Sequence, residues 1–110
     1  MRYADIVLPL AQPLYTFAVA EGMTLCEGMA VAVPFGRSKI YTGIVWRLHD
    51  RRPDFKTVKT VSRALYGTPL LDERQRRFWE WVADYYMCTL GEVMRVALPS
   101  LMKPSGHGEE

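Results

Sequence analysis

Basic and aromatic side chains are interleaved in the middle of this 110-residue chain. Residues 37–63 contain eight Lys or Arg and two Asp residues, a net charge of +6 in a chain whose total is +2. The flanking residues 1–36 and 64–110 each carry a net charge of −2. The aromatic residues in and beside the basic stretch are Phe35, Tyr41, Trp46 and Phe55. Cations that follow phosphates, next to rings on which bases stack, predict binding of single-stranded nucleic acid.

The same residues also have a structural interpretation. Trp46 shares one face of its expected strand with Ile44 and Leu48, which favours a place in the core. Arg51 and Arg52 can serve only to solubilise a loop. A protein-interaction domain is therefore the competing function class. It would show an exposed hydrophobic patch and little salt dependence in binding, whereas nucleic-acid binding weakens steeply as salt rises.

Groups able to catalyse a reaction are scarce. Neither His49 nor His107 has an obvious fixed partner in the sequence. Cys26 and Cys88 are far apart and form no Cys-x-x-Cys motif of the kind that holds zinc. Residues 36–39 lack the spacing of a nucleotide-hydrolysing phosphate loop and are typical of a hairpin turn. The sequence thus predicts no catalytic residue, no metal site and no cofactor in this chain, and we expect it not to be an enzyme.

Five short strands are expected to position the basic segment, at residues 3–8, 14–19, 29–35, 40–49 and 57–65. Their short connections favour antiparallel pairing, because a parallel sheet needs long crossovers. Gly43, in the middle of the longest strand, predicts a bulge or bend of the kind that closing barrels use. We therefore expect a small five-stranded antiparallel barrel.

Two helices are expected after the barrel, so the fold class is mainly β with C-terminal helices (α+β). Asp72 and Thr89 are each followed three residues later by Gln or Glu, as in a capping box. One stripe at i, i+3, i+4 and i+7 consists of Phe78, Trp81, Val82 and Tyr85. This spacing predicts that the stripe is the core face of the first helix. The second, shorter helix is expected to end before Pro99.

The chain is expected to form one domain over residues 1–103, with a barrel part at 1–66 and a helical part at 70–99. Residues 104–110 are polar and rich in glycine, which is typical of a linker or tail, so we expect the domain to belong to a longer protein. No stretch reaches the roughly 18 apolar residues of a membrane span. The amino terminus lacks the pattern of a secretory signal, so we expect no membrane partner and a cytoplasmic location.

Short phrases spread from Tyr3 to Met102 carry a family resemblance. They are Ile6-Val7-Leu8-Pro9, Tyr15-Thr16-Phe17, Glu21-Gly22-Met23, Val31-Ala32-Val33-Pro34-Phe35-Gly36-Arg37, Gly43-Ile44-Val45, Val58-Lys59-Thr60-Val61, Trp81-Val82-Ala83-Asp84-Tyr85-Tyr86, Leu90-Gly91-Glu92-Val93 and Ala97-Leu98-Pro99. Their order and spacing resemble the amino-terminal domain of the PriA family (primosomal protein N′), the bacterial proteins that restart stalled replication forks. The Val-Pro-Phe-Gly-Arg segment and the Ala-Asp-Tyr-Tyr helix together are its most specific part.

This resemblance implies an OB-like barrel with appended helices that captures the 3′ end of the nascent leading strand at a stalled fork. It implies a parent protein that is an ATP-dependent 3′→5′ DNA helicase, with ATP, magnesium and zinc bound outside this chain. The implied partners are forked DNA with a 3′-hydroxyl end, other domains of the parent chain and other primosome proteins. A single-stranded nucleic-acid-binding or protein-interaction barrel without 3′-end selectivity remains the alternative.

The resemblance also implies a pocket for the 3′ end. Its positions in this sequence are Phe17, Gly36 and Lys59, with Arg37 and Lys39 as auxiliary phosphate contacts. Phe17 would form an apolar wall for the last base, the Gly36 backbone can approach a nucleotide because no side chain intervenes, and Lys59 would hold phosphate or sugar oxygens. Ala18 stands where the family often has aspartate. Its side chain accepts no hydrogen bond, so either backbone groups recognise the 3′ end or the selectivity is weaker.

Overall fold

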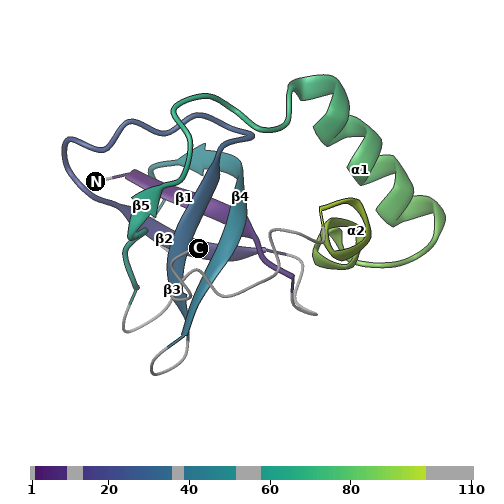
Figure 1. Cartoon of the computed structure of the whole chain (residues 1–110), viewed down its shortest axis with the longest axis horizontal. Coiled ribbons are helices and arrows are strands. Elements are labelled where there is room, and N and C mark those ends of the chain that lie inside the picture. Colours follow the sequence, from purple (N-terminus) through teal and green to yellow (C-terminus); the bar gives the residue numbers. More distant parts are fainter. Residues whose placement is uncertain (1, 10–13, 36–38, 52–57, 99–110) are drawn as a thin grey trace.

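The computed structural model describes residues 2–9, 14–35, 39–51 and 58–98. Its elements are β1 (Arg2–Val7), β2 (Tyr15–Val19), β3 (Ala30–Phe35), β4 (Lys39–His49), β5 (Arg63–Ala64), α1 (Glu73–Tyr85) and α2 (Leu90–Ala97). The sheet has the strand order β2-β1-β4-β3-β5, and its strand pairs are antiparallel. Both helices lie on the same side of the sheet (Figure 1). The predicted fold class, a mainly β domain with C-terminal helices, is confirmed.

Buried residues form two clusters, because successive strand residues point to opposite faces of the sheet. The sheet core consists of Ala4, Ile6, Leu8, Phe17, Val19, Leu25, Met29, Val31, Val33, Val45 and Val61. The helix-side core consists of Val7, Ala30, Ile44, Trp46, Leu71, Trp79, Val93 and Met94. The helices therefore cover one face of the sheet, and the sheet core is enclosed by the strands and the segments that connect them.

Residues 59–65 touch both edges of the sheet. On the β2 side, the Ala18 amide donates to the carbonyl of Lys59 at 2.9 Å, and Ala18 forms a parallel bridge with Thr60. On the β3 side, the Ser62 amide donates to the carbonyl of Ala32 at 2.9 Å. Because the segment divides its hydrogen bonds between two edges, β5 is shorter than the strand predicted at 57–65. Closure into a barrel depends on this bridge and stays a prediction.

A β-bulge lies in β4 at Trp46. The β1–β4 register shifts between Asp5 and Ile6, which leaves Trp46 as the extra residue. The bulge was predicted at Gly43 and lies three residues further along the chain. Gly43 instead permits close contact with β1, since a Cβ atom there would overlap the side chain of Ile6. Because of the bulge, Leu48 packs against the sheet core and not on the face of Trp46 as simple alternation predicted.

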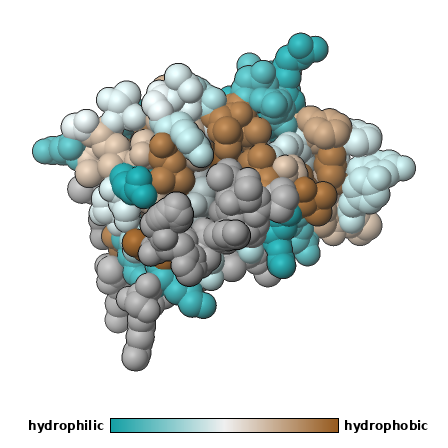
Figure 2. Space-filling view, viewed as in Figure 1, coloured by the Kyte–Doolittle hydropathy of each residue, from teal (hydrophilic) through white to brown (hydrophobic). Residues whose placement is uncertain are grey.

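α1 buries a different side from the predicted one. The stripe expected in the core is exposed, at 60% for Phe78, 57% for Trp81 and 65% for Tyr85. Val82 packs against the helix-side core, but the buried aromatic residue of the helix is Trp79, which is 5% exposed. Figure 2 shows hydrophobic residues reaching the surface over the helical part of the molecule. The prediction of a buried aromatic stripe is therefore wrong.

The reason is a second apolar stripe with the same spacing. Trp79, Val82 and Ala83 also lie at i, i+3 and i+4, and they pack against the helix-side core. Trp79 stacks on Trp46 with ring centroids 5.8 Å apart, and the indole N–H of Trp46 donates to the Glu80 carboxylate at 2.8 Å. These contacts come from a strand distant in the sequence, so helical periodicity alone does not select between the two stripes.

Candidate nucleic-acid interface

Phe17 and Lys59 lie on adjacent backbone segments, joined by the hydrogen bond from Ala18 to the Lys59 carbonyl. The Phe17 ring is buried in the sheet core, with 4% of its surface exposed, whereas Lys59 is exposed. Gly36 and Arg37 lie outside the described residues. The structure therefore places two of the predicted pocket positions on neighbouring segments, one buried and the other exposed.

Neither the side chain nor the backbone amide of Ala18 is available to contact a nucleotide. Its side chain is buried, and its amide already donates to the Lys59 carbonyl. Its carbonyl accepts from the Val61 amide at 3.0 Å. Because the amide is committed within the protein, backbone recognition of a nucleotide would have to come from another residue.

Three rings gather where β2 begins and where β3 ends against β4, and we call Tyr15, Phe35 and Tyr41 the hairpin ring cluster. Phe35 meets Tyr15 edge to face with centroids 5.3 Å apart, and its centroid lies 5.6 Å from that of Tyr41. All three are half-buried against the sheet core. Phe35 and Tyr41 were predicted candidates, whereas Tyr15 was missed. The sequence feature that could have identified Tyr15 is its position two residues before Phe17, which puts both residues on the same face of the strand.

Lys39 lies on the same side as these rings. It is directly opposite Phe35 in the β3–β4 register, and opposite residues of an antiparallel pair project to one face. This end of β3 and β4 points away from both helices (Figure 1). Trp46, by contrast, is 3% exposed in the helix-side core, which confirms its structural interpretation. Phe55 lies outside the described residues.

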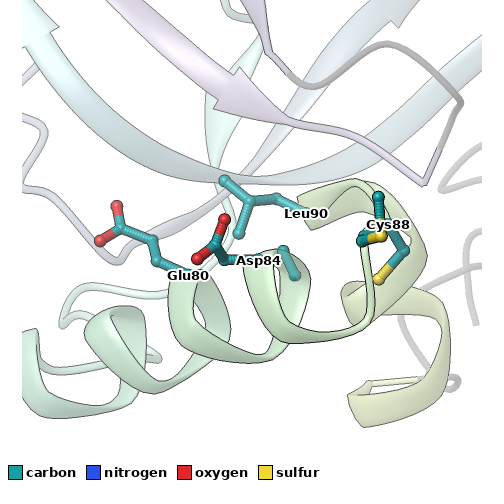
Figure 3. Close-up of a pocket in the computed structure, with 6 residues that line it drawn as sticks. Glu80, Asp84, Cys88 and Leu90 are labelled. Atoms are coloured by element: carbon teal, nitrogen blue, oxygen red, sulfur yellow. The ribbon is translucent and has the colours of Figure 1, made fainter.

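The inner side of α1 is acidic. Glu80 and Asp84 line a pocket of about 500 Å³ at the corner between α1 and α2, together with Cys88 and Leu90. Figure 3 shows the two carboxylates projecting from α1, one turn apart. Two neighbouring carboxylates make this pocket an unfavourable place for a phosphate group.

Two arginines of α1 are paired with carboxylates. Arg76 contacts Glu27 at 3.3 Å, and Arg77 contacts Glu73, one turn away, at 2.7 Å. The Arg76–Glu27 pair connects α1 to the segment before β3, while the exposed Arg77–Glu73 pair lies within the helix. These guanidinium groups are less available to phosphate than an unpaired cation would be.

His49 has a partner that the sequence did not indicate. Its Nε2 lies 3.0 Å from the Asp5 carboxylate, which also accepts a hydrogen bond from the Thr16 hydroxyl at 2.8 Å. This contact ties β1, β2 and β4 together. In residues 2–9, 14–35, 39–51 and 58–98 no group of three or more His, Cys, Asp or Glu side chains could hold a metal ion. In the same ranges, no helix is long and apolar enough to cross a membrane.

Residues 5–99 match the family described as the 3′DNA-binding domain (3′BD) of PriA. The chain belongs to this family. It is similar to replication restart protein PriA of Synechocystis sp., with 33% identity over 97 residues that cover 84% of this chain and 11% of that protein. It is also 30% identical over 101 residues to replication restart protein PriA of Haemophilus influenzae, covering 90% of this chain and 14% of that protein. The 3′BD chain thus spans 11–14% of these curated relatives.

Proposed function

We propose that this 3′BD binds the 3′ end of the nascent leading strand at a stalled fork, within a longer replication-restart helicase. Membership of a DNA-binding family supports DNA as the ligand. The observation that carries the proposal is the hydrogen bond from the Ala18 amide to the Lys59 carbonyl, because it fixes the backbone of an exposed lysine beside the strand that carries Phe17. Helicase activity, ATP with magnesium, zinc and contacts with primosome proteins would belong to other parts of the parent protein, and the site itself has no catalytic role.

The proposed pocket assigns one task to each group. Phe17 supports the apolar floor of the pocket from below, since its ring is held in the sheet core with 4% of its surface exposed. Gly36 offers main-chain hydrogen bonds, and Lys59 holds the terminal sugar-phosphate. Arg37 and Lys39 add attraction that does not depend on the terminus. We also propose that the unit extends over residues 1–103 and that residues 104–110 form a linker.

Fluorescence anisotropy with 5′-labelled oligonucleotides tests this proposal. A strand that ends in a 3′-hydroxyl should bind more tightly than the same strand with a 3′-phosphate, because the added group enlarges the terminus and brings further negative charge into the pocket. Equal affinity for the two strands would contradict 3′-end recognition even if DNA binding remained.

A lysine variant separates the pocket from general phosphate contact. Lys59→Ala should weaken the 3′-hydroxyl strand more than the 3′-phosphate strand, since Lys59 contacts the terminus only when the terminus fits. Arg74→Ala, at an exposed position on α1, is the matched control and should leave the ratio of the two affinities unchanged. A uniform loss in Lys59→Ala would favour the alternative, a single-stranded nucleic-acid-binding barrel without 3′-end selectivity.

A second function is favoured by the exposed side of α1, where we propose docking onto another domain of the parent chain. We call Phe78, Trp81, Tyr85 and Tyr86 the α1 ring row, and 57–66% of each residue is exposed. Val96 of α2, which is 84% exposed, lines an apolar groove together with Phe78 and Tyr86 of the row. Clusters of exposed apolar side chains mark interaction surfaces. The matched relatives are far longer than this domain, so the rest of such a chain is the proposed occupant.

Photo-crosslinking in the full-length protein tests this docking. Benzoylphenylalanine replaces Trp81, and the same replacement of Tyr66, which is 50% exposed and outside the row, is the control. The Trp81 probe should form crosslinks to residues beyond 110 within one chain, and the Tyr66 probe should form few. Crosslinks only between copies, only to other primosome proteins, or none above the control would contradict the proposal.

A further inference from the structure

We propose that the hairpin ring cluster, Tyr15, Phe35 and Tyr41, is a stacking surface for the bases that precede the 3′-terminal nucleotide. The proposal rests on the proposed function and names where the strand continues beyond the terminal pocket. Its ligand is single-stranded DNA of any sequence, because every base has a flat face that can stack on an aromatic ring.

The cluster borders the predicted pocket from two directions. Tyr15 and Phe17 share one face of β2 and are two residues apart, which corresponds to about 7 Å along a strand. Phe35 directly precedes Gly36 in the sequence. A strand whose last base lies over Phe17 would therefore have its preceding base within reach of Tyr15 and Phe35.

The contacts within the cluster do not stack its rings face to face. Tyr15 and Phe35 meet at 89°, and Phe35 and Tyr41 at 62°, so the contacts are edge to face. An edge-to-face contact covers a face of only one of its two rings. The rings are half-buried against the sheet core, which fixes their orientation while part of each remains at the surface. A base then stacks on a surface whose conformational entropy has already been lost.

The charge beside the cluster suits a nucleic-acid strand. Lys39 projects to the same face as Phe35 and is exposed, so it can contact a phosphate while a base lies on the rings. The acidic contact on β2, in which Thr16 binds Asp5, belongs to the opposite face of that strand. Partly exposed rings beside a cation are the combination found on surfaces that bind single-stranded DNA.

An abasic substitution tests the stacking without changing the protein. A 5′-labelled oligothymidine with a 3′-hydroxyl is compared with one that lacks the bases at the positions just before the terminal nucleotide. Wild-type protein should bind the abasic strand at least about fivefold more weakly, the loss expected for one stacked base. Equal binding of the two strands would overturn the proposal.

Leucine variants assign the effect to the rings. Tyr15→Leu and Tyr41→Leu keep apolar volume against the sheet core but remove the flat ring. Each should bind the intact strand more weakly and show a smaller difference between intact and abasic strands. Tyr85→Leu, the same change in the α1 ring row, should behave as the wild type. An unchanged ratio in both folded hairpin variants would overturn the assignment, and if neither folds, the abasic comparison with wild type decides.

The same titrations separate this proposal from the proposed function. The preference of wild-type protein for a 3′-hydroxyl over a 3′-phosphate reports the terminal pocket. The preference for intact over abasic strands reports the stacking surface. Loss of the first with retention of the second would contradict 3′-end recognition alone, whereas the reverse result would contradict stacking alone.

Discussion

The domain has two groups of aromatic rings, and their surroundings differ more than their composition. The hairpin ring cluster is half-buried, its rings meet edge to face, and Lys39 lies beside it. In the α1 ring row, Phe78, Trp81 and Tyr85 are more than half exposed, and their planes are within 18° of parallel. Trp81 stacks with both Phe78 and Tyr85, and Tyr86 meets Tyr85 edge to face at 84°. The stacked rings lie against one another, so what the row offers is mainly exposed apolar area.

This contrast separates two kinds of partner. A base stacks on a ring face beside a cation for its phosphate, which is the combination that we propose at the hairpin. A protein surface needs apolar area that it can exclude from water, as on α1. Aromatic content alone therefore indicates no ligand, and the arrangement of the rings and the neighbouring charge must be considered together.

The largest expected effect separates the exposed and buried sides of α1. Trp79→Ala should lower the free energy of unfolding by about 3–5 kcal/mol, because it empties a space against Trp46 in the helix-side core. Trp81→Ala, two residues away on the exposed side, should cost about 1 kcal/mol or less. Urea unfolding followed by circular dichroism measures both. Similar losses of stability in the two variants would show that the α1 ring row stabilises the fold, and would contradict its assignment as an exposed docking surface.

A matched pair of phenylalanines gives the next largest effect, this time between the two ring groups. Phe35→Ala should cost about 2 kcal/mol, roughly half the value for a fully buried ring, since Phe35 is half-buried. Phe78 is 60% exposed, and Phe78→Ala should stay within about 0.5 kcal/mol of wild type. Thermal and urea unfolding of both variants provide the measurement. A neutral Phe35→Ala would mean that the hairpin rings are as loosely held as those on α1.

Local patterns in the sequence predicted much of the fold. Alternation and turn residues indicated the strands, and both capping boxes are present, with the Asp72 and Thr89 side chains each accepting from the amide three residues later. These features depend on neighbours in sequence. The bulge at Trp46 and the choice of Trp79 for the core depend on contacts between distant segments, so no local pattern contains them.

The candidate site, like the fold, was predicted only in part from the sequence. Lys59 was chosen through the family resemblance, and its position beside β2 follows from a backbone hydrogen bond that connects residues 18 and 59. Tyr15 was missed because it lies outside the basic stretch at 37–63, and only the folded sheet brings it to Phe35. A search limited to one charged segment cannot find a ring contributed by another strand.

The smallest of the three effects is a salt dependence that should differ between the two ring groups. Lys39 and Lys59 are the described cations assigned to the proposed DNA site, and each phosphate contact with a single strand adds a slope of about −0.7 in log K against log salt. Raising salt from about 50 to 200 mM should therefore weaken oligonucleotide binding by at least about sevenfold. Anisotropy titrations measure this change, and Trp81→Ala should leave it unaltered because the substitution removes no charge and lies outside the proposed DNA site. Docking through the α1 ring row should change by less than about twofold over the same range, as expected for apolar contact. A flat salt response for DNA, or an equally steep one for docking, would remove the assigned difference between the two groups.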